Sequence, residues 1–139
     1  MVFSLNICLA NTNPLTDKSK HIYHPQNRDE LVQLLRDENI KLDSIDTSKI
    51  TDMSFLFANM FDYWCDEFAP HMQTCKNTAG KRKDFSGIET WDVSNATDMD
   101  SMFYHAKSFK QNLDSWKVNK NANINYMFYN SSIESNPPK

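Results

Sequence analysis

Three residues in one stretch of the chain have side chains that could do chemistry. Cys65, His71 and Cys75 follow a Cys-x5-His-x3-Cys spacing, which could place three ligands around zinc, with Asp66 or His105 as a fourth. The spacing matches no established zinc motif. The same two cysteines could instead form a disulfide that closes this loop and indicates an oxidising compartment, or they could remain free thiols. In the disulfide alternative, the predicted pair is Cys65 and Cys75, which leaves Cys8 unpaired.

Catalysis has little support in this sequence. Cys65 or Cys75 with His71 is the only local pair of a nucleophile and a base, and no family motif surrounds it. The chain has 2 glycines, Gly80 and Gly87, so a dinucleotide fingerprint, a phosphate-binding P-loop and a nucleophile elbow cannot occur. We therefore expect a protein that is not an enzyme and that needs no cofactor and no metal.

Length and charge narrow the function classes further. The chain has 139 residues, of which 40% are hydrophobic, so it can form one domain with a core. Lys and Arg number 15 against 18 Asp and Glu, which argues against nucleic acid as a partner. No apolar run is long enough to span a membrane. The basic triplet Lys81-Arg82-Lys83 is typical of a solvated loop tip.

Three segments of the chain repeat one pattern. They begin at Ile45, Trp91 and Trp116, and the first two are identical at six of thirteen positions. The second and third begin 25 residues apart, whereas the first and second begin 46 apart, which is one repeat period plus 21 extra residues and indicates an insertion between them. The pattern predicts repeats near 45–57, 85–115 and 116–131, with an insertion over 58–84.

Each repeat is expected to contain a very short strand and a short helix. Trp91–Ser94 alternates apolar and polar residues, as in a strand with one buried face. Met99, Met102, Phe103 and Ala106 recur at helical spacing after the capping box that begins at Thr97. Stacked repeats would align their strands in parallel. The predicted fold class is thus an α/β repeat, a short leucine-rich-repeat-like solenoid of about three units with an N-terminal capping helix.

The two ends of this solenoid are predicted to differ. Asn27–Glu30 has the pattern of a capping box, and the leucines that follow it predict an amphipathic helix within a cap over 21–44. Residues 1–20 are expected to be a flexible N-terminal segment, and 21–139 a single repeat domain. The third repeat has Asn121 and Ser131 where apolar residues stood earlier, which predicts a polar outer face.

Two groups of residues are candidates for partner binding. The polar sides of the strands would form aligned columns of Asp46, Asp92 and Lys117 and of Ser48, Ser94 and Asn119. The insertion carries aromatic residues without a repeat position to fill, and such residues commonly anchor protein interfaces. The aromatic candidates are Tyr63, Trp64 and Phe68. The repeated methionines, phenylalanines and tryptophans are instead expected to form the core.

The second repeat carries a specific family resemblance. The string FSGIETWDVSNATDM over residues 85–99, followed by Met102-Phe103 and by FKQNL over 109–113, resembles the BspA-like leucine-rich-repeat surface proteins of bacteria. The resemblance covers about residues 21–130 without the insertion. It implies a non-catalytic surface or secreted protein that binds other proteins, with adhesion to host matrix or to other bacteria as the family's role.

The compartment is open to a second interpretation. The N-terminal stretch Val2–Ala10 is apolar but lacks the basic start of a signal peptide, so it is no convincing export signal. The family resemblance favours the cell surface, the periplasm or secretion. The alternative is a small cytoplasmic inhibitor or immunity-type protein that masks one partner protein.

Overall fold

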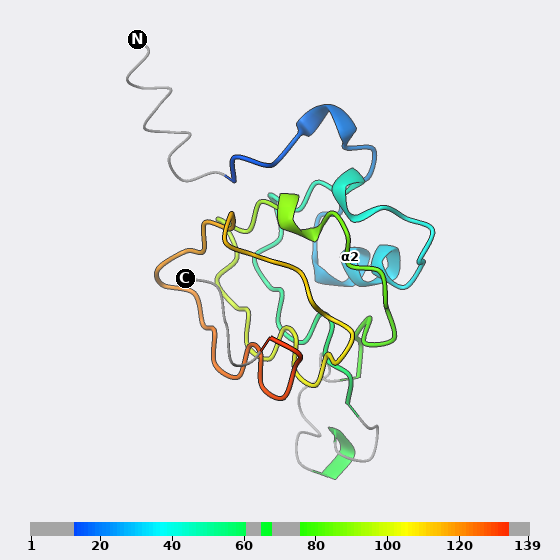
Figure 1. The fold of residues 1–139 in the computed structure, drawn as a ribbon, viewed down its shortest axis with the longest axis vertical. Helices are drawn as coiled ribbons and strands as arrows, with labels where there is room; N and C mark the ends of the chain where they lie inside the picture. Colours follow the sequence, from blue (N-terminus) through cyan, green and yellow to red (C-terminus); the bar gives the residue numbers. More distant parts are fainter. Residues whose placement is uncertain (1–12, 61–64, 68–75, 134–139) are drawn as a thin grey trace.

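The computed structural model describes residues 13–60, 65–67 and 76–133 (Figure 1). Within them the chain forms the α-helix α2 (Arg28–Leu35) and the short 3-10 helices η1 (Lys18–Lys20), η2 (Leu42–Ser44) and η4 (Ile88–Thr90). The predicted N-cap at Asn27 is confirmed, and Glu30 reaches back to the amide before the N-cap residue. Asn27 Oδ1 accepts a hydrogen bond from the Glu30 amide, and Glu30 Oε1 accepts one from the Gln26 amide.

The predicted α/β repeat of strands and helices is wrong. Trp91–Ser94 is no strand, and the residues after Thr97 form turns where a helix was expected. Among the described residues, strand-like pairing between repeats is limited to isolated parallel bridges, which join Asp52 to Asp98 and Asp98 to Asn123. The described part of the chain therefore contains no sheet and no leucine-rich-repeat solenoid of strands and helices.

Backbone conformation explains why no helix or strand forms in the repeats. Phe55, Ser101 and Tyr126 occupy the same position in the three repeats, and each has a φ between 56° and 58°. His105 and Asn130 share a second such position, with φ near the same value. A left-handed residue interrupts both the helical and the extended conformation, so the chain turns repeatedly instead.

The repeats are held together by backbone hydrogen bonds between turns. We call residues 51–59, 97–105 and 122–130 the three turn segments. Amide groups of alternate residues in one turn segment donate to carbonyl groups of the next, over 2.7 to 3.0 Å. From first to second these are Met53 to Asp98, Phe55 to Asp100, Phe57 to Met102 and Asn59 to Tyr104. From second to third they are Met99 to Asn123, Ser101 to Asn125, Phe103 to Met127 and His105 to Tyr129.

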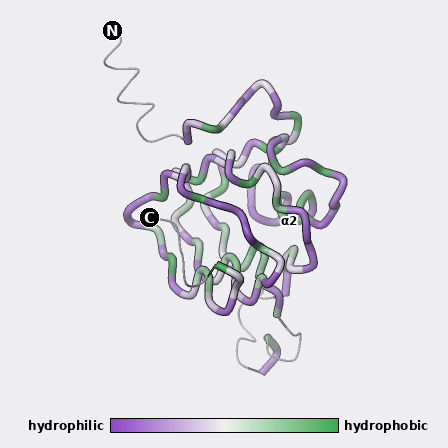
Figure 2. The backbone as a smooth tube through the Cα atoms, viewed as in Figure 1, coloured by the Kyte–Doolittle hydropathy of each residue, from purple (hydrophilic) through white to green (hydrophobic). Residues whose placement is uncertain are grey.

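The core lies along equivalent positions of these segments. The rings of Phe57, Phe103 and Phe128 stack in a column, with centroids 5.4 and 5.5 Å apart. The indole N–H groups of Trp91 and Trp116 donate to carbonyl groups at 2.9 and 3.0 Å, so each buried ring keeps a polar partner. Hydrophobic residues recur along the turn segments in Figure 2. The predicted core role of the repeated methionines and aromatic residues is confirmed.

The first turn segment is covered by other parts of the chain. The Arg28 Nε of α2 donates to the Ser54 carbonyl at 2.8 Å. The Ala79 amide donates to the Leu56 carbonyl, and the Thr78 hydroxyl to the Ala58 carbonyl. In Figure 1, α2 and the third turn segment accordingly lie at opposite ends of the row.

The described part of the N-terminal segment contacts the repeats. Asn13, which is 4% exposed, donates from its side-chain amide to the carbonyl groups of Glu89 and Trp91. Thr16 donates to the Thr90 carbonyl at 2.6 Å. No helix in the described ranges has the length and apolar character needed to cross a bilayer.

Candidate functional site

The structure brings together the first two members of each predicted polar column. In both the Asp46–Ser48 and the Asp92–Ser94 turn, the aspartate Oδ1 accepts hydrogen bonds from the serine amide and hydroxyl, over 2.6 to 3.0 Å. The Thr47 hydroxyl donates to the Asp92 carbonyl at 2.9 Å, so the two turns lie side by side. One carboxylate oxygen of each aspartate therefore stabilises its own turn.

Lys117 and Asn119, the third members of the two predicted columns, have no such hydrogen bonds to the first two turns. Asn119 Oδ1 accepts a hydrogen bond from the Asn121 amide, and Lys117 is exposed. Of the hydrogen bonds between described residues, none links Lys117 or Asn119 to the Asp92–Ser94 turn. The predicted aromatic candidates Tyr63, Trp64 and Phe68 lie outside the described residues.

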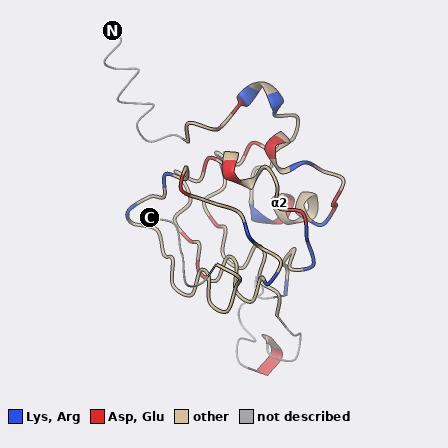
Figure 3. Cartoon of the chain, viewed as in Figure 1, with Lys and Arg blue, Asp and Glu red and all other residues tan. Residues whose placement is uncertain are grey.

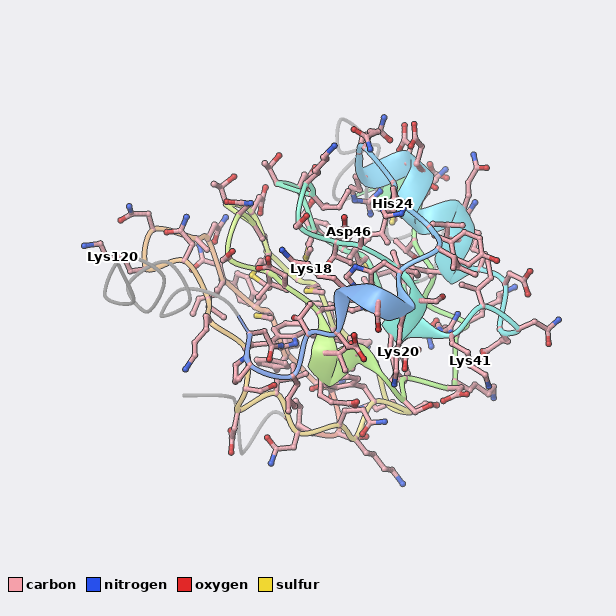
Figure 4. The ribbon with its side chains drawn as sticks, turned by 90° about the horizontal axis from the view of Figure 1, so that it is seen from above. Lys18, Lys20, His24, Lys41, Asp46 and Lys120 are labelled. Carbon is pink, nitrogen blue, oxygen red and sulfur yellow. The ribbon has the colours of Figure 1, made fainter. Side chains whose placement is uncertain are left out.

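The polar columns border a face of mixed charge. His24 Nδ1 lies 3.3 Å from Asp46 Oδ2, and Lys20 Nζ lies 3.5 Å from Asp43 Oδ2. Burial opposes ionisation of Asp46, but hydrogen bonds from Ser48 and His24 outweigh it and hold the Asp46 pKa below its ordinary value. Figure 4 shows Lys18, Lys20 and Lys41 on this face with His24 and Asp46. Cations and anions are interspersed along the chain (Figure 3), so the face has no single sign.

Cys65 is disulfide-bonded and 2% exposed. A sulfur atom in a disulfide is no thiolate ligand, which argues against the zinc alternative. The described residues contain no group of three His, Cys, Asp or Glu that could hold a metal ion. His71, Cys75 and Cys8 lie outside the described residues, so the pairing of Cys65 with Cys75 stays a prediction.

The basic triplet differs from the expected solvated tip at its central residue. Arg82 is 4% exposed, and its guanidinium donates to the carbonyl groups of Leu35, Asp37, Ile40 and Asp84 over 2.8 to 3.0 Å. It therefore caps the carbonyl end of α2 and the turn after it. Arg82 borders a cavity of about 490 Å³ that Arg36 and Lys76 also line. Arg36 donates to Asn77 and Thr78, and Lys76 pairs with Asp66, so these cations have structural partners.

A surface that the sequence analysis missed lies on the third turn segment. We call Val118, Ile124, Tyr126 and Tyr129 the terminal face; they are 38%, 54%, 68% and 42% exposed. Three of their counterparts in the second repeat are buried, with Val93 at 1%, Met99 at 0% and Ser101 at 4%, and the fourth, Tyr104, is partly buried. The predicted polar outer face of the third repeat is found only in part: Asn121 is exposed, but Ser131 is buried and these larger apolar residues are exposed as well. The signal in the sequence was that Val118 and Ile124 keep the apolar character of Val93 and Met99.

Aromatic rings extend the terminal face toward the second turn segment. Tyr104 and Tyr129 stack with ring centroids 5.0 Å apart, and Tyr126 meets Tyr129 edge-on at 6.1 Å. His105 stacks on Tyr104 at 4.4 Å. Burial, and then Lys107, lowers the pKa of His105, so its ring is neutral at pH 7. Burial raises the pKa of Tyr104, which keeps its phenol protonated. The terminal face itself consists of aliphatic and tyrosine side chains and contains no Asp, Glu, Lys or Arg.

Comparison with known families now places the chain. A family model described as "Mycoplasma protein of unknown function, DUF285" matches residues 27–137. The chain belongs to the DUF285 family. No curated protein and no solved structure matches it. The DUF285 match begins at the N-cap residue of α2 and includes all three turn segments and the terminal face.

Proposed function

We propose that this DUF285 chain is a non-catalytic protein-binding module of the cell surface or of secreted proteins, with an adhesin-like role. The observation that carries the proposal is the terminal face, where Val118, Ile124 and Tyr126 are exposed although their counterparts in the second repeat, Val93, Met99 and Ser101, are buried. A cluster of exposed apolar residues on a folded domain is typical of a protein-binding surface.

The chemistry of the terminal face fits a protein partner. Tyrosine is enriched at the energetically dominant positions of interfaces, because it offers a large contact area with few rotatable bonds. Tyr126 and Tyr129 are exposed here beside the aliphatic Ile124 and Val118. The absence of Asp, Glu, Lys and Arg among these four residues favours an interface core over a solvated rim.

Two observations support a location outside the cytoplasm. Cys65 is disulfide-bonded, and structural disulfides persist mainly in oxidising compartments. The second repeat also resembles the BspA-like surface proteins. On this basis the partner is a host matrix protein or a bacterial surface protein.

A binding assay with matched variants tests the proposal. The chain is applied to immobilised host matrix proteins and to bacterial surface protein extracts, alone and as the double variant Ile124→Ser, Tyr126→Ser. The control variant is Ile22→Ser, Leu15→Ser, which removes residues that are 70% and 50% exposed outside the turn segments. We expect the terminal-face variant to bind at least about tenfold more weakly and the control to bind normally. Equal loss in both variants, or none in either, contradicts the proposal.

A further inference from the structure

The third turn segment also carries a row of backbone amide groups that have no hydrogen-bond partner among the described residues. The amides of Met99, Ser101, Phe103 and His105, which we call the inner row, all donate to the third turn segment. Their counterparts one repeat later are the amides of Ile124, Tyr126, Phe128 and Asn130, which we call the terminal row. No hydrogen bond joins any amide of the terminal row to another described residue.

The terminal row continues a ladder that the molecule has already formed twice. The Thr51 carbonyl accepts from the Asp98 amide, and the Thr97 carbonyl accepts from the Asn123 amide. Ala122 holds the same position in the third turn segment, and its carbonyl accepts no bond from a described residue. The exposed edge thus presents four donors and one acceptor in the order that joins the inner segments. An unpaired edge of this kind is a template for adding another extended chain.

A second folded copy of this chain cannot supply the matching carbonyl groups. In the second and third turn segments they already accept the ladder hydrogen bonds. In the first, three of the four matching carbonyl groups, those of Ser54, Leu56 and Ala58, accept from Arg28, Ala79 and Thr78, so that only the Asp52 carbonyl accepts no bond from a described residue. Two terminal faces in symmetric contact would place donors opposite donors. The edge therefore favours a segment that is not yet part of a fold.

We propose that the terminal face binds an unfolded segment of a partner polypeptide, which adds to the edge as a fourth turn segment. This inference rests on the proposed protein-binding function and names the form of the ligand. Backbone carbonyl groups of the partner segment accept hydrogen bonds from the amides of the terminal row. One backbone amide of the partner segment donates to the Ala122 carbonyl.

Side chains set the partner's sequence preference. In the second turn segment, Met99, Met102 and Phe103 are fully buried at positions that match Ile124, Met127 and Phe128 in the third. A bound segment in the same register would place its own residues at these positions over Ile124, Met127 and Phe128. The preferred ligand therefore carries apolar residues in the order apolar-x-x-apolar-aromatic, with an aromatic residue extending the phenylalanine column.

The probe is a synthetic peptide with the sequence ATDMDSMFYHA, that of residues 96–106. It contains the carbonyl groups that accept the ladder from the first turn segment. Amide hydrogen exchange of the full chain is measured by NMR with and without the peptide, and a scrambled peptide of the same composition is the control. When about nine-tenths of the chain is bound, we expect exchange in the terminal row to slow about tenfold. The scrambled peptide should leave it unchanged.

Three results would overturn the proposal. The first is no slowing in the terminal row at millimolar peptide. The second is slowing by the scrambled peptide as well. The third is a terminal row that is already as protected as the inner row in the free chain, because the edge is then occupied.

The binding assay above separates this inference from the proposed function. If Ile124→Ser, Tyr126→Ser abolishes partner binding while the terminal row exchanges equally fast with and without that partner, the protein-binding function stands and the added segment is refuted. If those substitutions leave partner binding intact, the proposed function fails first.

Discussion

Replacing Arg82 by methionine tests how the first end of the repeat row is held. The guanidinium donates three hydrogen bonds to carbonyl groups at the end of α2 and just after it and a fourth to the Asp84 carbonyl, and the residue is 4% exposed. Methionine fills much of the same volume but donates nothing. Each charge-assisted hydrogen bond contributes about 1.5 kcal/mol or more, and several of the carbonyl groups would remain buried without a partner.

The expected cost of Arg82→Met is about 3 to 5 kcal/mol of unfolding free energy, since relief of the desolvated charge offsets part of the loss. Urea unfolding followed by circular dichroism measures it. With a slope near 1.5 kcal/mol/M, the midpoint should fall by about 2 to 3 M. The neighbouring substitution Lys81→Met, at an exposed position, is the control and should change stability by less than about 0.5 kcal/mol. A loss below about 1 kcal/mol in Arg82→Met would refute the capping role.

Three other predictions concern Asp98, the disulfide of Cys65 and Gly87. Burial, with repulsion from Asp52 and Asp100, raises the pKa of Asp98. The folded state therefore favours the protonated carboxyl group, and the stability that this protonated group contributes is lost as the pH rises through the pKa of the folded state. Asp98→Asn should therefore stabilise the chain at pH 7 by up to about 1 kcal/mol and lose that advantage near pH 3, as urea unfolding at both pH values would show. Peptide mapping without reductant should yield a fragment linking Cys65 to Cys75; linkage to Cys8 would contradict the predicted pairing. Gly87 has φ 95°, and an added Cβ would lie 2.9 Å from the Asp43 amide nitrogen, so Gly87→Ala should lower the free energy of unfolding by about 1 to 2 kcal/mol; unchanged thermal stability would contradict this.

The register of the repeats could be predicted from the sequence. The offsets of 46 and 25 residues that align the sequence motifs are the same offsets that separate Asp52, Asp98 and Asn123, which the isolated bridges join. The N-cap at Asn27 and the burial of the repeated methionines and aromatic residues could also be predicted, because each depends on residue types that are close together in the sequence. At these positions the sequence pattern agrees with the structure, because the type of a single residue determines whether it caps a helix or is buried in the core.

The local conformation could not be predicted, because its signal was missing. Phe55, Ser101 and Tyr126 adopt left-handed backbone conformations without a glycine to indicate them. The apolar residues at helical spacing therefore predicted a helix. In the structure, successive turns bury the same residues at a similar spacing. Arg82 was missed because its partners lie about 45 residues away, and a buried arginine cannot be distinguished from a solvated one by its neighbours in sequence.

The terminal face could be seen only in three dimensions. Val118 and Ile124 look like core residues in the sequence, as their counterparts Val93 and Met99 are. They are exposed because no described segment packs over the third turn segment as that segment packs over the second.

Amide hydrogen exchange of the free chain tests the central claim most directly. The account predicts that the inner row exchanges at least about a hundredfold more slowly than the terminal row, because only the inner row donates to a neighbouring segment. Equal protection of the two rows would contradict it, since the terminal face would then have no open edge to offer a partner.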